Sequence, residues 1–371
     1  MVYVLFMFPR WARSLAIAAV VGLAAWAPAG ARGAGPTANP EASATSPQAS
    51  ATSPSGTTAP AASRTTPGAT PSPTKPAAPV TARVTLYLPD AFFVDRQPVT
   101  VPRRVFHIFG VVRPYVADQW VKLRAFLRGR LIKTDELRLK PSPDHAYGRF
   151  REAIASPGAG EITVSVLHGA TLQLARFDAR RSLAALDEQI GFGSTGRFVQ
   201  LIQQRLAALH FYIPQTGVLD QGTGLALDAY HRLLHWGTYQ NLDGRTVSYL
   251  LNGWGAFKVH FPGHGRHAEG NLSLQLLALV DGSRVYRIYP ISSGKPSTPT
   301  ILGDFQVYSQ VPGYLPDGMY YSNFFIRGYA IHGYDPAPDY PASHGCMRLP
   351  IVDATSVYYW LAIGDWVDVY N

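Results

Sequence analysis

The sequence predicts a multidomain, mainly-β fold, in which a β-sandwich-like domain and a small helical bundle precede a strand-rich C-terminal domain. Three observations indicate this order. The hydrophobic period is two over residues 82–180, three to four over 182–253, and strand-like apolar runs return over 256–371. With 371 residues, of which 47% are hydrophobic, the chain can form two or three domains with buried cores.

The first 31 residues have the pattern of a secretory signal peptide. Arg10 and Arg13 precede an apolar stretch over residues 14–27, which has the length of a signal sequence and is short for a membrane-spanning helix. Because residues 1–8 are also apolar, an uncleaved membrane anchor is the alternative. In either case we expect an exported protein, in the periplasm, in the cell wall or at the outer face of the cytoplasmic membrane.

Residues 32–81 form a Pro/Ala/Ser/Thr tract with almost no charge. The sequence Ala-Ser-Ala-Thr-Ser-Pro at 42–47 recurs at 49–54. Such a composition cannot bury enough apolar surface to offset the entropy lost on ordering, so it predicts a disordered linker.

The formal net charge is +9 and the isoelectric point is about 9.6. A basic exported protein is attracted to anionic surfaces, so anionic wall polymers and, through the N-terminus, the membrane are candidate partners. The sequence has no nucleic-acid-binding motif, and export argues against a nucleic-acid partner.

Alternation of apolar and polar residues over 82–180 predicts the β-sandwich-like domain. Residues 121–126 and 162–166 alternate in this way, and turn signals such as Arg128-Gly129 separate the runs. The basic residues of this part, such as Arg124, Arg128 and Arg130, either bind an anionic polymer or form a solvated strand face.

Helical periodicity begins after this part and covers residues 182–253. One apolar stripe contains Phe198, Leu201, Ile202, Leu206 and Leu209, and Pro214-Gln215-Thr216-Gly217 breaks the helix. The segment resembles the helical peptidoglycan-binding module found beside wall enzymes. The matching positions are Gly193, Gly196, Val199, Ile202-Gln203, Gly217-Val218-Leu219-Asp220, Thr223, Ala226 and Tyr230-His231. A three-helix bundle without a ligand is the alternative.

The C-terminal part, residues 256–371, is predicted to consist mostly of strands. Two apolar runs around Asp281-Gly282 predict a hairpin, and residues 366–370 predict a closing strand. Residues 329–333 predict a strand that ends near His332. Pro350 suits the first turn of a helix, whose apolar face would include Ala354, Val357, Tyr358 and Leu361 and which Gly364 would end.

The only cysteine of the chain, Cys346, lies in this domain. Exported proteins usually pair their cysteines or lose them, and a single cysteine forms no internal disulfide. His344 and His332 are candidate partners that would activate this thiol as a nucleophile. A buried, inert cysteine is the alternative, although the neighbouring Gly345 and Arg348 are not typical of an apolar core.

Two ordered motifs resemble those of the L,D-transpeptidase (YkuD-like) catalytic domain. They are Ile331-His332-Gly333 and Ser343-His344-Gly345-Cys346-Met347-Arg348. Ser293-Gly294-Lys295 and the segment Thr298-Pro299-Thr300-Ile301-Leu302-Gly303-Asp304-Phe305 occur upstream, at the places the family leads one to expect. The sequence departs from many members in a shorter loop between His332 and Ser343, and in Arg348 where many members have asparagine.

The resemblance implies the chemistry of a cysteine acyltransferase. Cys346 would attack a stem tetrapeptide, His332 would be its base, and the carbonyl of Gly333 would orient the imidazole ring. D-alanine would leave, and the thioester would pass to the side-chain amine of a second stem in a three-to-three cross-link. The N–H groups of Cys346 and Gly345 would form the oxyanion hole. No metal and no cofactor is required.

The remaining motif residues have two interpretations each. His344 either shapes the pocket and stabilises the thioacyl state or is purely structural. Arg348 either holds a substrate carboxylate or pins the loop. Met319 and Tyr320 resemble the substrate-covering lid of the family, with an aromatic core as the alternative. For Ser343 we expect hydrogen bonds within the turn.

A separate histidine cluster, His260, His264 and His267, has a spacing that invites a zinc interpretation. Pro262 and the neighbouring glycines prevent a helix that would align these side chains, and we expect no acidic or thiol partner nearby in sequence. We therefore expect an interdomain loop without a metal.

Three functions are compatible with these motifs. The first is a peptidoglycan L,D-transpeptidase, which could also attach proteins to the wall by the same acyl transfer. The second is an L,D-carboxypeptidase that gives the thioester to water, since it needs the same Cys346 and His332. The third is a non-catalytic wall-binding protein with a decayed catalytic domain.

Overall fold

The computed structural model describes residues 77–371. The predicted signal or anchor over residues 1–31, and the predicted linker up to residue 76, lie outside the described residues. Within residues 77–371, no helix has the length and hydrophobicity needed to cross a membrane.

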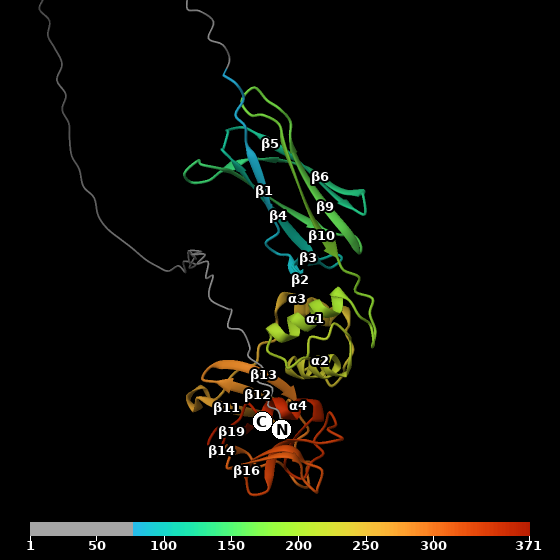
Figure 1. The fold of residues 1–371 in the computed structure, drawn as a ribbon, viewed down its shortest axis with the longest axis vertical. Helices are drawn as coiled ribbons and strands as arrows, with labels where there is room; N and C mark the ends of the chain where they lie inside the picture. Colours follow the sequence, from blue (N-terminus) through green and yellow to red (C-terminus); the bar gives the residue numbers. More distant parts are fainter. Residues whose placement is uncertain (1–76) are drawn as a thin grey trace, which may run out of the picture. The chain divides into compact units, whose positions relative to one another are not determined.

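The first part of the described chain is a β domain of two sheets (Figure 1). One sheet has the strand order β1-β4-β8-β7 and the other has the order β2-β3-β10-β9-β5-β6. The strands are β1 (Arg83–Tyr87), β2 (Phe92–Val94), β3 (Gln97–Thr100), β4 (Val105–Arg113), β5 (Trp120–Leu127), β6 (Arg130–Arg138), β7 (Lys140–Pro141), β8 (Gly148–Ala155), β9 (Gly160–His168) and β10 (Phe177–Ala185).

Alternation along these strands puts one face of each sheet into a shared core. Phe106 and Ile154 from the first sheet pack in one cluster with Leu123 and Val164 from the second, and each is at most 1% exposed. Each fully buried side chain of this size contributes about 1.5–3 kcal/mol relative to an exposed one. The predicted β domain upstream of the catalytic part is therefore confirmed.

The last strand of this domain extends beyond the predicted boundary at residues 180–182. β10 continues to Ala185, because Ser182 to Ala185 pair with Thr163 to Gly160 of β9. Leu183 and Ala185 are buried, so the period of two continues through the predicted boundary. The first helix begins only at Arg197.

Three helices follow where the helical periodicity predicts them. They are α1 (Arg197–Ala208), α2 (Gln221–Leu233) and α3 (Gly244–Asn252). Asp220 and Asp243 cap α2 and α3, since each side chain accepts a hydrogen bond from a backbone N–H of the first turn. Phe198, Leu201, Ile202 and Leu206 of the predicted stripe are buried, whereas Leu209 follows the helix and is half-buried. The chain leaves the helix before residues 214–217, where the break was expected.

The C-terminal part contains two further sheets and one helix. The strand orders are β13-β12-β11-β19-β14 and β15-β16-β17-β18. The elements are η1 (Pro262–His264), β11 (Arg266–Asn271), β12 (Leu276–Asp281), β13 (Arg284–Pro290), β14 (Gly303–Gln306), β15 (Ser309–Tyr314), β16 (Tyr320–Ile326), β17 (Tyr329–Gly333), β18 (Met347–Leu349), α4 (Ile351–Tyr358) and β19 (Trp366–Tyr370). The predicted hairpin β12–β13 and the predicted closing strand β19 are both present.

The predicted end of the last helix at Gly364 is wrong. α4 ends at Tyr358, and Gln310 Nε2 donates to the carbonyls of Tyr358 and Leu361, which the helix leaves without partners. Leu361 still packs in the core, but from a turn that follows the helix. Pro350 is the residue that precedes α4 at its N-cap.

Candidate active site

Two neighbouring parallel strands bring His332 and Cys346 to the same place in the fold. Ile331 of β17 lies opposite Met347 of β18, and His332 lies opposite Arg348. Cys346 directly precedes β18, so it reaches the strand that carries His332 although 14 residues separate the two in sequence. His332 is 2% exposed and Cys346 is partly buried.

The imidazole of His332 is oriented by its own strand. Nδ1 lies 2.9 Å from the carbonyl oxygen of Gly333 and donates to it, which leaves the lone pair of Nε2 free to accept a proton. Burial lowers the pKa of His332 to about 4, and the positive charge of Arg348 acts in the same direction. At neutral pH this histidine is therefore an uncharged base.

The thiol of Cys346 is also uncharged at rest. Burial raises its pKa, and the negative charge of Asp317 adds to that effect, while Arg348 opposes it. Sγ donates to the carbonyl oxygen of Gly328 at 3.9 Å, and a hydrogen bond with the backbone of Ala330 also opposes the rise in its pKa. The thiol and the imidazole are therefore both neutral at rest, because charge separation is costly in this buried site.

Ser343 shapes the loop that carries the cysteine. Its Oγ donates to the carbonyl oxygen of Cys346 at 2.6 Å and accepts from the N–H of Gly345 at 3.0 Å. The hydrogen bonds expected within the turn are present. They also occupy the Gly345 N–H, so the expectation that Gly345 donates to an oxyanion does not fit this conformation. The Cys346 N–H remains the candidate donor.

Gly345 cannot be replaced by a larger residue without a local shift. Its φ is +118°, in the region that favours glycine, and a Cβ would lie 2.3 Å from Cε1 of Tyr329. The ring of Tyr329 therefore packs directly on the backbone beside the nucleophile.

A short segment, residues 291–294, holds the cysteine loop at both of its ends, and we call it the clamp segment. Ser292 and Arg348 exchange two backbone hydrogen bonds of 2.9 Å. The carbonyl oxygen of Ser293 accepts from the N–H groups of Ala342 and Ser343, also at 2.9 Å. The backbone before and after Cys346 is thus fixed to one piece of chain.

The clamp segment is itself anchored by a buried polar chain that begins in α2. Gln275 bonds Ser293 twice, with Oε1 accepting from its N–H at 2.8 Å and Nε2 donating to its Oγ at 2.7 Å. Arg232 Nη1 donates to the carbonyls of Gln275 and Ile291 at 3.0 Å each. Its Nη2 pairs with Asp228 at 2.5 Å, and both of these side chains are at least 95% buried. The sequence interpretation missed all three polar side chains.

A protein-family model for the L,D-transpeptidase catalytic domain, YkuD, matches residues 265–369, a range that contains β17, the cysteine loop and the clamp segment. The chain belongs to the L,D-transpeptidase family. A search of the curated proteins found no match.

Solved structures of L,D-transpeptidases resemble the chain as well. One from Xylanimonas cellulosilytica is 30% identical over 49% of this chain and 97% of that chain, with a TM-score of 0.45. One from Mycobacterium tuberculosis is 22% identical over 29% of this chain and 58% of that chain, with a TM-score of 0.27. The catalytic domain from E. faecium is 25% identical over 29% of this chain and 98% of that chain, with a TM-score of 0.26. The family assignment rests on the family model.

Arg348 of the L,D-transpeptidase domain lies against an aromatic ring. Its guanidinium carbon is 4.0 Å from the ring centroid of Tyr334, and this ring in turn meets His332 edge-on at 5.8 Å. Within residues 77–371, no carboxylate lies within 4.0 Å of this guanidinium. The stacking fits a role in pinning the loop, and the guanidinium retains N–H groups that could bind a substrate carboxylate.

The remaining predicted residues of the transpeptidase site differ in exposure. Met319 is 8% exposed, which fits the core interpretation. Tyr320 is half-buried opposite Gly333, with the rings of Tyr314 and Tyr321 at 4.4 and 4.6 Å. His344 is exposed, and its Nε2 lies 3.2 Å from Nζ of Lys295. Tyr320 is therefore the predicted lid residue that borders the strand of His332.

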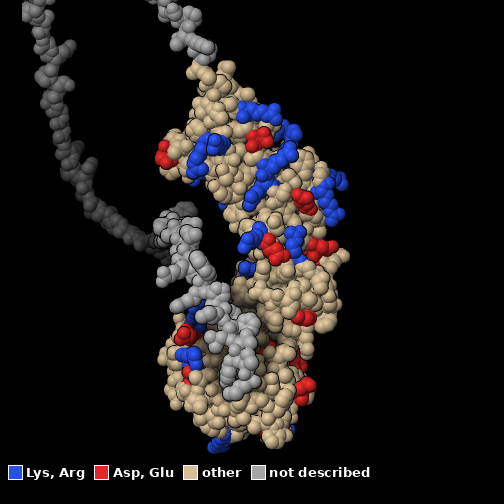
Figure 2. Space-filling model, in the orientation of Figure 1, with Lys and Arg blue, Asp and Glu red and all other residues tan. Residues whose placement is uncertain are grey.

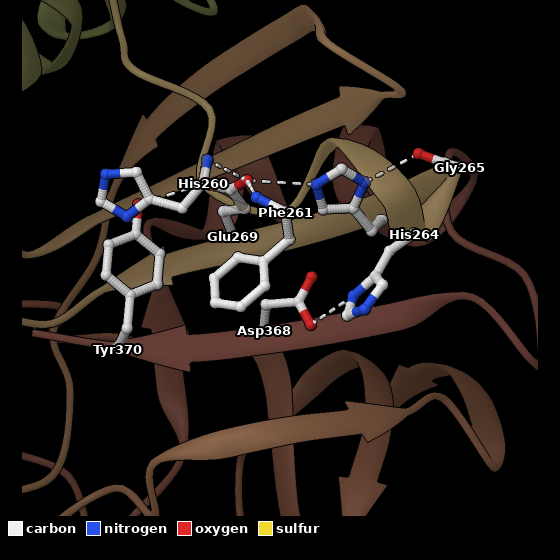
Figure 3. Close-up of polar contacts among 8 residues, drawn as sticks. His260, Phe261, His264, Gly265, Glu269, Asp368 and Tyr370 are labelled. Atoms are coloured by element: carbon white, nitrogen blue, oxygen red, sulfur yellow. Dashed lines mark hydrogen bonds and ion pairs between the residues drawn. The ribbon is translucent and has the colours of Figure 1, made fainter.

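The histidine cluster of the transpeptidase domain is not an interdomain loop (Figure 3). His267 lies fully buried on β11, with Nε2 3.2 Å from Oε1 of Glu269. Nδ1 of His264 lies 2.9 Å from Oδ1 of Asp368, and Glu269 also accepts from the N–H of His260. The expectation that no acidic partner lies nearby in sequence is wrong, because Glu269 follows His267 by two residues. Asp368, the partner of His264, comes from β19. Among residues 77–371, no group of three or more potential metal ligands is present.

Proposed function

We propose that this protein is a peptidoglycan L,D-transpeptidase in which Cys346 is the nucleophile and His332 is the base. The observation that carries the proposal is the orientation of the buried imidazole: Nδ1 donates to the carbonyl of Gly333, and Nε2 is left as a neutral base on the strand beside Cys346. General-base activation of a thiol needs this combination of an accepting ring nitrogen and a nearby thiol.

Acylation starts from the neutral pair. The thiol proton passes to Nε2 of His332 as Sγ bonds to the carbonyl carbon between the third stem residue and the terminal D-alanine. The carbonyl oxygen then carries the negative charge, which the Cys346 N–H stabilises. When the C–N bond breaks, His332 returns the proton to the nitrogen of D-alanine, and a thioester to Cys346 remains.

Transfer reverses these roles. A neutral side-chain amine of a second stem attacks the thioester, and its proton passes through His332 to the departing Sγ. The new amide is a three-to-three cross-link, and the free thiol is restored. If water attacks instead, the product is a tripeptide, which is the carboxypeptidase reaction.

The proposed substrates, stem peptides, are part of the cell wall, so the proposed activity lies outside the cytoplasm. Members of the L,D-transpeptidase family also act on cell wall peptidoglycan. We propose that the N-terminal residues direct export, as a signal peptide or an anchor, and that the helical part, residues 182–253, binds peptidoglycan. A pull-down on purified wall sacculi with and without that part tests the latter.

Mass spectrometry of the products tests the function. The protein is incubated with disaccharide-tetrapeptide, and Cys346→Ala and His332→Gln variants run beside it. We expect a dimer that has lost one D-alanine, absent with Cys346→Ala. Tripeptide without dimer would identify a carboxypeptidase, and an unchanged substrate would favour a non-catalytic wall-binding protein.

A further inference from the structure

The positive charge of the described chain is concentrated in the β domain. Residues 82–185 contain 17 lysines and arginines against nine aspartates and glutamates, a formal charge of +8. Residues 186–371 contain 11 against 14, a formal charge of −3. On the face drawn in Figure 2, blue side chains gather over the β domain. The β domain is therefore the part that anions encounter most favourably.

Part of this charge lies in a groove of about 450 Å³ where β6 meets β7 and β8. The groove is lined by Phe109, Glu136, Leu137, Arg138, Lys140, Arg149, Phe150 and Arg151. Glu136 pairs with Lys122, and Arg138 pairs with Asp118. Within residues 77–371, no carboxylate oxygen lies within 4.0 Å of the side-chain nitrogens of Lys140, Arg149 or Arg151. These three cations give the groove its net charge.

The arrangement of these cations disfavours a purely structural role. Lys140 and Arg149 lie directly opposite each other on β7 and β8, and like charges in that position destabilise a sheet. Arg151 follows two residues later on the same face, opposite Phe109, whose ring lies 6.3 Å from that of Tyr87. A bound anion would relieve the repulsion, and Phe109, Leu137 and Phe150 give the groove an apolar wall.

We propose that this groove binds a linear phosphodiester polymer. Arginine presents its N–H groups in a planar fork that matches phosphate oxygens, and two of the three unpaired cations are arginines. Arg149 and Arg151 repeat about every 6.7 Å along β8, since they are two residues apart on one strand. A chain of phosphates separated by three-carbon units has a comparable repeat. A concave groove also fits a chain better than it fits the plane of a bilayer.

Binding of a defined poly(glycerol phosphate) to the full chain tests the proposal. Affinity is measured by calorimetry at several salt concentrations. Polygalacturonate, which carries carboxylates, and phosphatidylglycerol vesicles are measured in parallel. We expect the phosphodiester chain to bind most tightly, with a logarithmic salt dependence that reports the number of phosphates contacted. Tighter binding to the vesicles or to polygalacturonate would overturn the assignment of the ligand.

Two triple variants with the same loss of charge locate the site. The groove variant is Lys140→Gln/Arg149→Gln/Arg151→Gln, and the matched control is Arg124→Gln/Arg176→Gln/Arg180→Gln, which are exposed cations of the same domain. We expect the groove variant to bind at least tenfold more weakly and its salt slope to fall by about 2, since each contact contributes about 0.7. An equal loss of affinity in both variants would show that the polymer is attracted by the overall charge of the domain and not bound in the groove. Circular dichroism verifies the fold of both, and unchanged cross-linking of soluble stem peptides separates this proposal from the catalytic one.

Discussion

In the proposed mechanism, the thiol of Cys346 and its base His332 are both neutral at rest because both are buried. His332 is 2% exposed, and desolvation lowers the pKa of its imidazole to about 4, while it raises the pKa of the Cys346 thiol. Under the proposed mechanism, we therefore expect proton transfer to be coupled to attack on the substrate and not to precede it. A neutral resting thiol also reacts slowly with soluble oxidants and alkylating agents, since the thiolate is the reactive form.

This state predicts the pH dependence of acylation. Because His332 must be neutral to accept the proton, kcat/KM should rise with pH through the pKa of this histidine, near pH 4. If His332 had the ordinary pKa of an imidazole, this rise in kcat/KM, the acid limb of the profile, would occur near pH 6.5. The Arg348→Gln variant removes a charge that lowers this pKa, so its acid limb should move to higher pH. An acid limb at pH 6–7 in the unaltered protein, measured where circular dichroism is constant, would contradict a neutral resting pair.

Gly345 offers a second prediction at the scale of one residue. In Gly345→Ala the new methyl group would lie 2.3 Å from the ring of Tyr329. The loop must shift, and a displacement of about 1 Å at a nucleophile lowers the rate by roughly 100-fold. Gly263→Ala, which meets no atom within 4 Å, is the control. Thioester formation, followed by the mass of the protein, should fall in the first variant alone; equal rates would show that the loop tolerates the methyl group.

At the scale of elements, the buried pair on α2 supports the clamp segment. Arg232→Met leaves Asp228 buried without a counter-charge, which destabilises by about 3–5 kcal/mol. Asp228→Leu/Arg232→Met removes both charges, so much of the stability should return. The hydrogen bonds to the carbonyls of Gln275 and Ile291 stay lost in both, and cross-linking should therefore remain reduced.

Urea unfolding and product formation distinguish the two effects of these variants. Arg245→Met on α3 is the control, because its guanidinium stacks on Trp236 and contacts no part of the clamp segment. Full activity in the double variant would show that α2 does not position the cysteine loop. Equal unfolding free energies in the single and the double variant would show that the lone charge is not the main cost.

The strands β11 and β19 carry a pH-dependent contribution to stability. Burial raises the pKa of Asp368 to about 6, although His264 opposes the shift. A raised carboxyl pKa favours folding below the ordinary pKa of about 4, and this contribution is lost as pH rises through 6. Asp368→Asn keeps an acceptor for His264 without the charge. The variant should therefore gain stability relative to the unaltered protein between pH 4.5 and pH 8. An equal stability difference at both pH values would contradict this.

At the scale of the whole molecule, sequence patterns correctly predicted those features that depend on residues close together in the sequence. The period-two runs predicted the β domain. The Asp281-Gly282 signal predicted a hairpin, and a short motif with a fixed order predicted that His332 and Cys346 belong together. The predicted end of the last helix was wrong because a side chain distant in sequence stabilises the actual end. Gln310 donates to the carbonyls of Tyr358, the last residue of α4, and of Leu361.

Long-range polar pairs were beyond sequence interpretation for the same reason. Asp368 lies 104 residues from His264, and Arg232 lies 43 residues from the carbonyl of Gln275 that it bonds. No periodicity connects such positions. The i,i+4 spacing of Asp228 and Arg232 on α2 is a signal that could have indicated this buried pair.

The most direct test of the account is the mass of the acyl-enzyme. The full chain is incubated with a stem tetrapeptide that lacks an acceptor amine, quenched in acid, and digested for peptide mapping. We predict a mass increase equal to the tetrapeptide minus D-alanine, on the peptide that contains Cys346, and none in Cys346→Ala. Release of D-alanine without an adduct on Cys346, or an adduct that persists in Cys346→Ala, would contradict the account.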